Sequence, residues 1–177
     1  MTRSSAPHLA LLLPVLAFLT FSHARIPSRG SQTAFEVRNA FNDSAFRLPY
    51  AEARLSTFPD YSVQSLEAQQ FPVLGAVDIQ TRLLRIVMQP GSRLATQLHP
   101  RGNEVIHVVR GAAKISFTFE SDPSLDTVLR RVTNVVRARE VALIPQGLVH
   151  DVECVSKVHP CILLSVANSA DPGFVVL

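Results

Sequence analysis

The chain has 177 residues, of which 47% are hydrophobic and 18% are charged. This composition can supply one ordinary hydrophobic core, and it excludes an intrinsically disordered chain. The formal net charge is +3, but the basic residues are scattered and no aromatic residues interleave with them. We therefore expect a single globular domain without a nucleic-acid partner.

Residues 1–24 have the pattern of a secretory signal peptide. Arg3 precedes an apolar run over residues 9–21, and the small residues Ser22 and Ala24 place the cleavage before Arg25. The run is shorter than the roughly 20 residues that a membrane-spanning helix needs, although an uncleaved anchor is the alternative. We predict a secreted, extracellular protein that has no membrane partner once the signal is removed.

Residues 25–55 are predicted to form an irregular N-terminal arm. The composition up to residue 50 is polar, and only a few aromatic residues could dock this segment, so we expect a loosely held arm. Residues 56–70 are also predicted to be irregular, before the regular part of the domain. The aromatic residues of the arm are Phe35, Phe41 and Phe46.

The domain, residues 56–177, alternates short β-rich runs with turn residues. Residues 114–120 alternate apolar and polar side chains without a fault, as in a strand with one buried face. Gly, Pro, Asn and Asp residues separate the other runs, and no long amphipathic helix is evident. This succession is typical of a β-sandwich or barrel. The other runs are residues 83–88, 105–109, 131–136, 141–144, 150–155 and 162–166.

Secretion gives meaning to two further features of the sequence. Cys154 and Cys161 flank a turn-like segment at 156–160, so a disulfide across a hairpin is one interpretation. Two small buried thiols are the other. Asn42 opens an Asn-Asp-Ser sequon, which predicts a glycosylation site.

The metal-ligating candidates are His99, Glu104, His150 and Gln97. Gln97 and His99 are two residues apart, so they project from one face of an extended chain, and a four-residue loop leads back to Glu104. His150 opens a strand on its apolar face. Two buried imidazoles and a buried carboxylate are costly unless a cation compensates them, although each histidine alone could be an ordinary core residue. The donor set suits manganese, iron or zinc.

Two motifs of the sequence resemble those of the cupin superfamily. The first is Gly91-x5-Gln97-x-His99-x4-Glu104-x6-Gly111, and the second is Pro145-x-Gly147-x2-His150. The amino-acid sequences of residues 71–75, 99–104 and 145–150 are similar to those of plant germin-like proteins, and the similarity runs from about residue 46 to the end of the chain.

This resemblance implies an all-β fold with a single cupin jelly-roll barrel. It also implies a glycoprotein of the apoplast or cell wall that holds Mn²⁺ on three histidines and one glutamate. Three of these ligands carry over onto His99, Glu104 and His150; Fe²⁺ or Zn²⁺ would suit the same donors. Some germin-like proteins are oxalate oxidases or superoxide dismutases, and many have no established activity.

The sequence departs from the germin-like pattern at several positions. Gln97 replaces the first motif histidine, so a weaker amide ligand stands where a good nitrogen donor is usual. Arg139 replaces a glycine, Cys154 replaces an asparagine, and the paired N-terminal cysteines of germins are absent. The sequence ends at Leu177, before the helices through which germins assemble. A homo-oligomer formed through the barrel edges is the assembly that we keep as a hypothesis.

Two functions are therefore compatible with the sequence. The first is a manganese-dependent oxidoreductase that acts on superoxide or on a small carboxylate such as oxalate. The second is a metal-poor cupin that serves as an extracellular binding or storage protein, a nutrient reservoir without catalysis. The metal content of the purified protein would discriminate between them.

Overall fold

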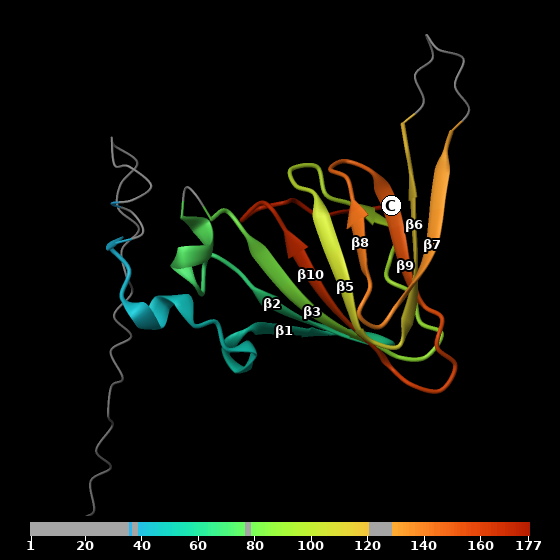
Figure 1. Cartoon of the computed structure of the whole chain (residues 1–177), viewed down its shortest axis with the longest axis horizontal. Coiled ribbons are helices and arrows are strands. Elements are labelled where there is room, and N and C mark those ends of the chain that lie inside the picture. Colours follow the sequence, from blue (N-terminus) through green and yellow to red (C-terminus); the bar gives the residue numbers. More distant parts are fainter. Residues whose placement is uncertain (1–35, 37–38, 77–78, 121–128) are drawn as a thin grey trace, which may run out of the picture.

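The computed structural model describes residues 36, 39–76, 79–120 and 129–177. The predicted signal peptide, Phe35 and residues 121–128 lie outside these ranges. The described part contains eleven strands and three short 3₁₀ helices, and the strands form two antiparallel sheets (Figure 1). The predicted all-β jelly-roll architecture is confirmed. None of the helices in the described ranges has the length and apolar character to cross a membrane.

The larger sheet has six strands. The pairing of β10 with both β3 and β5 places the middle of the chain beside its C-terminal part. Along this sheet the order is β1 (Arg54–Thr57), β2 (Tyr61–Leu66), β3 (Arg82–Met88), β10 (Cys161–Ala167), β5 (Glu104–Arg110) and β8 (Val141–Ile144).

The smaller sheet has five strands and faces the larger one (Figure 1). Its central strand β9 pairs with β6 over six residues and with β4 at one position. The order along this sheet is β11 (Val175–Val176), β4 (Gln97–Leu98), β9 (Val149–Cys154), β6 (Ala112–Thr118) and β7 (Arg131–Arg137).

The hydrophobic core lies between the two sheets and follows the two-residue period of the strands. In β10 every second side chain, from Cys161 to Ala167, is buried, and the intervening side chains are half-buried. Apolar side chains from both sheets meet this row. The fully buried members include Met88, Val108, Ile115, Val152 and Leu163.

The prediction that residues 56–70 are irregular was wrong. β2 occupies Tyr61–Leu66 and pairs with β3 over its whole length, and β1 crosses the boundary predicted between arm and domain. The sequence of β2 carries serines and a glutamine that interrupt its apolar pattern. Pairing with β3, which no local propensity reveals, makes it a strand. The strand predicted at 114–120 is also shifted, because β6 covers Ala112–Thr118.

The described part of the N-terminal arm packs on the end of the larger sheet. It contains the 3₁₀ helices η1 (Asp43–Phe46) and η2 (Tyr50–Glu52). Phe41 is buried in a second apolar cluster, whereas Phe46 is exposed. The cluster also receives the helix η3 (Pro72–Gly75), so the arm shares a core with the domain rather than lying loosely on it. Asn42 is exposed and caps η1 by accepting a hydrogen bond from the Ala45 amide.

Arg139, which replaces a glycine of the germin-like pattern, adopts a left-handed backbone with φ of 75°. This conformation costs about 1–2 kcal/mol for a residue that has a Cβ. Two backbone hydrogen bonds hold the turn, from Arg139 to the Val108 carbonyl and from Glu140 to the Arg137 carbonyl. Arg139 therefore forms the same turn that a glycine would form, but with local backbone strain.

Cys154 and Cys161 form a disulfide that joins the end of β9 to the start of β10, and thus the smaller sheet to the larger one. Both residues are fully buried. We expect the double variant Cys154→Ala/Cys161→Ala to lose about 2.5 kcal/mol of unfolding free energy, because a cross-link restricts the unfolded chain even when the loop is short. Urea denaturation monitored by circular dichroism would measure this loss.

Lys157→Ala provides the control, because Lys157 is exposed in the same turn. It should leave the urea midpoint unchanged. A double cysteine variant with the wild-type midpoint would contradict a stabilising cross-link.

Candidate metal centre

Three segments from both sheets place the predicted ligands between the layers. Gln97 lies in β4, and His99 is the first residue after this strand. His150 lies in β9 of the same sheet. Gln97 and His150 are direct cross-strand partners. Glu104, the first residue of β5, projects from the opposite sheet.

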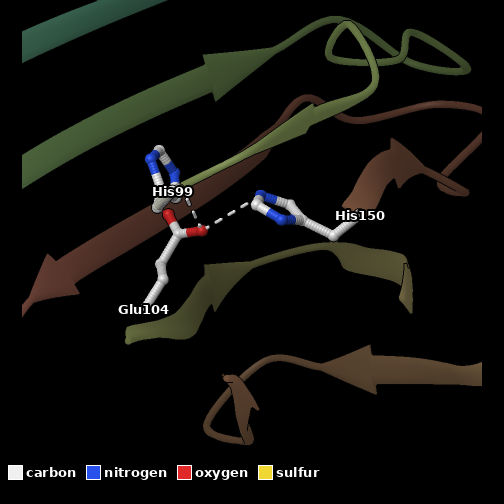
Figure 2. A group of neighbouring side chains, drawn as sticks. All are labelled: His99, Glu104 and His150. Carbon is white, nitrogen blue, oxygen red and sulfur yellow. Dashed lines mark ion pairs between the residues drawn. The ribbon is translucent and has the colours of Figure 1, made fainter. Parts of the chain in front are cut away.

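The structure brings His99, Glu104 and His150 together (Figure 2). Glu104 Oε2 lies 3.5 Å from His99 Nε2 and 3.3 Å from His150 Nε2. One ligand atom from each residue falls within 4.8 Å of the others. The three residues are only 6%, 3% and 1% exposed, so little water competes for these groups.

Backbone carbonyls orient both imidazoles. His99 Nδ1 lies 2.7 Å from the Gly173 carbonyl oxygen, and His150 Nδ1 lies 3.0 Å from the Leu148 carbonyl oxygen. A carbonyl can only accept, so each Nδ1 carries a proton and donates. In the neutral imidazole the lone pair is then on Nε2, and both Nε2 atoms face the Glu104 carboxylate. Metal-binding histidines are commonly held in this way.

The centre carries a negative charge that requires compensation. Burial by itself would raise the pKa of Glu104, but hydrogen bonds from His150 and His99, in the state in which their Nε2 atoms carry a proton, and from Ser165 lower it to about 2, so the group is a carboxylate. Burial lowers the pKa of His99, yet Glu104 and the Gly173 carbonyl raise it above its usual value. Glu104 Oε2 is buried and has no hydrogen-bond partner among the described residues. Either a proton on an imidazole or a bound cation would satisfy this arrangement.

Gln97 lies beside the group but presents its nitrogen. Its Nε2 is 3.2 Å from His150 Nε2, and the amide donates to the lone pair that a cation would use. A half-turn of the amide would direct Oε1 to the same place. Gln97 therefore reaches the centre, although in this orientation it competes with a cation instead of binding one.

The loops that carry the ligands are tied to one another. The Gly147 amide donates to the His99 carbonyl, and the Gln146 side chain donates to the Pro100 carbonyl. The Arg101 amide donates to the Pro172 carbonyl, next to the residue that orients His99. These hydrogen bonds fix the ligand-bearing loops relative to one another.

Sequence reasoning missed Ser165, whose hydroxyl donates to Glu104 Oε1. Ser165 is buried at an inward position of β10, where its neighbours in the row are apolar. A lone polar residue at such a position was the available signal. Asp151, which alternates with His150 and therefore points to the opposite face of β9, is also buried, and Arg131 Nη2 lies 2.6 Å from its Oδ2.

A cavity of about 270 Å³ opens onto the centre. Gln97, His99 and Glu104 line one side, and inward side chains of β1, β2 and β3 line the other. The Phe174 ring lies 5.9 Å from the His99 ring at the edge of this cavity. A small molecule could therefore reach Gln97, His99 and Glu104 from this cavity.

Two facing antiparallel sheets with an inward His-Glu-His group define a jelly-roll protein of the cupin type. The sequence model of the Cupin family matches residues 55–177, and the chain belongs to this family.

The curated relatives support the predicted likeness to germin-like proteins. Oxalate oxidase GF-2.8 of Triticum aestivum is 30% identical over 149 residues, which cover 84% of this chain and 63% of that protein. Germin-like protein 3-5 of Oryza sativa subsp. japonica is 32% identical over 114 residues, or 64% of this chain and 47% of that protein. The chain thus spans about half to two thirds of the length of these relatives.

A solved structure of oxalate oxidase superposes on this chain with a TM-score of 0.65 at 26% sequence identity. The matched part covers 79% of this chain and 67% of the oxalate oxidase chain. The agreement confirms the jelly-roll fold. Together with the His-Glu-His group, it suggests a metal cofactor.

Proposed function

We propose that this protein is a germin-like cupin that binds Mn²⁺ on His99, Glu104 and His150. The observation that carries the proposal is the convergence of two Nε2 lone pairs and a buried carboxylate oxygen on one point. Manganese is chosen because the germin resemblance implies it, although Fe²⁺ and Zn²⁺ suit the same donors.

The proposed activity is oxidoreduction of superoxide or of a small carboxylate such as oxalate. A manganese ion bound here would supply one-electron exchange with a molecule at its open positions. The chain's own contribution is to hold the donors and limit water. The Gly173 and Leu148 carbonyls keep the Nε2 lone pairs inward, Ser165 holds the carboxylate, and the cavity admits a small substrate.

The setting that we propose is the extracellular space of a plant, in the apoplast or cell wall. The signal-peptide pattern of residues 1–24 and the exposed Asn42 sequon support this proposal. A homo-oligomer through the edge strands of the two sheets remains part of the hypothesis, with residues 25–55 as the arm and 56–177 as the cupin domain.

Elemental analysis of the secreted protein, purified without added metal, tests the proposal. We expect manganese to be the main bound metal and its content to rise on Mn²⁺ loading. The loaded sample should show superoxide dismutase activity or produce peroxide when oxalate is added. Less than about a tenth of an equivalent after loading would contradict the proposal and leave the metal-poor binding or storage protein. Iron or zinc in place of manganese would contradict the choice of ion.

A further inference from the structure

One wall of the cavity beside the metal centre is formed by paired residues of β2 and β3. Inward residues of β2 and β3 pair in rows, with Ser65 opposite Leu84 and Val63 opposite Ile86. All four line the cavity. Arg82, at the start of β3, lies on the same face because it is two residues before Leu84. The wall therefore has a charged end at Arg82 and an apolar surface beyond it.

Arg82 and Glu104 belong to one row of the larger sheet. Both are cross-strand partners of Ala167, from opposite sides of β10. Adjacent strands are about 4.8 Å apart, so the Cα atoms of Arg82 and Glu104, two strands apart, are separated by about 10 Å. Only the methyl group of Ala167 lies between the two side chains. β3, β10 and β5 run side by side in Figure 1. The guanidinium can thus face the same space as the Glu104 carboxylate.

An ion pair holds Arg82 in place and leaves part of its guanidinium available. Arg82 Nη2 lies 2.7 Å from Glu67 Oε1, and both side chains line the cavity. Arg82 Nε is buried and has no hydrogen-bond partner in the described ranges. The Arg82 side chain as a whole is 24% exposed, so other donors of its guanidinium are open to the cavity. An arginine fixed in this way is suited to donate hydrogen bonds to a carboxylate. Arg54, the other guanidinium of this cavity, is exposed.

The rest of the cavity is suited to an apolar body. Leu84, Ile86 and Val63 form the wall, and Leu94 and Phe174 lie across from them. The volume of about 270 Å³ exceeds the about 150 Å³ of an apolar cavity that binds benzene. A two-carbon dicarboxylate would leave most of this apolar surface uncovered.

We propose that Arg82 is the carboxylate-binding residue of this cavity and that the ligand is a small organic acid with a compact apolar body, such as an aryl carboxylate. The carboxylate lies at the end shared by Arg82 and the metal centre, and the apolar body covers Leu84 and Ile86. The inference deepens the proposed function and rests on it for the metal end of the site. The Arg82 end is testable without the metal.

Isothermal titration calorimetry with phenylacetate and oxalate tests this inference on the purified protein, both Mn²⁺-loaded and EDTA-treated. We expect phenylacetate to bind more tightly than oxalate, and Arg82→Gln to weaken phenylacetate binding at least tenfold. Arg85→Gln is the matched control, because Arg85 lies on the outer side of the same strand and pairs with Gln64. It should change the affinity by less than twofold.

Two further variants keep the test decisive if Arg82→Gln does not fold. Arg82→Lys retains a charge for Glu67 but lacks the Nε donor, and should weaken phenylacetate binding several-fold. Leu84→Asn should weaken phenylacetate binding and spare oxalate. Wild-type affinity in folded Arg82 variants, or tighter binding of oxalate than of phenylacetate, would overturn the inference. Arg82-dependent binding in protein that takes up no manganese would overturn the proposed function alone.

Discussion

The variant Gln97→His is expected to bind Mn²⁺ about ten- to a hundredfold more tightly than the wild-type protein. Gln97 is buried directly opposite His150, and its Nε2 lies 3.2 Å from His150 Nε2. The amide therefore occupies a lone pair that the ion needs. An imidazole in its place would remove this competitor and add a nitrogen donor, which divalent manganese, iron and zinc accept. Equilibrium dialysis followed by elemental analysis measures the change.

Gln89→His is the matched control for this gain. Gln89 is exposed after β3, so a histidine there adds a nitrogen donor to the protein without adding one to the centre. Its Mn²⁺ affinity should equal that of the wild type. Equal affinity of Gln97→His and the wild type would show that the centre lacks more than one donor, in which case the storage or binding role becomes the better hypothesis.

The variant Glu104→Gln is expected to lose at least about a hundredfold in Mn²⁺ affinity. Glu104 supplies the only carboxylate of the three-residue group found in the described ranges, and its low pKa keeps it charged at neutral pH. Glutamine keeps the volume and can still accept from Ser165, but it removes the charge that attracts the cation. Equilibrium dialysis of the variant, with circular dichroism to establish folding, provides the measurement.

Glu153→Gln separates a local effect from a change in net charge. Glu153 lies on the outer face of β9 and pairs there with Lys114 and Arg93. Its neutralisation should leave Mn²⁺ affinity unchanged. If a folded Glu104→Gln variant bound Mn²⁺ as well as the wild type does, Glu104 would not be a ligand.

The ligand candidates could be predicted from the sequence because their positions follow local rules. The spacing of Gln97 and His99 places them on one face of an extended chain, and the strand after the turn at Gly147 points His150 inward. The strands β3, β5, β7, β8, β9 and β10 were also recognised from their β-branched residues, with boundaries within about two residues.

The remaining features depend on which strands are neighbours. Ser165 contacts Glu104, and Arg82 shares a row with it, only because β10 lies between β3 and β5. Strand order and register are properties of the folded sheet, so no local pattern reveals these contacts. The same holds for β2, whose polar residues concealed a strand that its pairing with β3 stabilises.

The ligand candidates are divided between the two layers of the fold. His99 and His150 belong to the side of β4 and β9, whereas Glu104 extends from the layer opposite. A cation bound by His99, His150 and Glu104 would cross-link the two sheets, in addition to the disulfide between β9 and β10. Binding or loss of the ion would then strengthen or weaken the association of the two sheets. The rigidity of the sandwich would therefore increase with the occupancy of the metal centre.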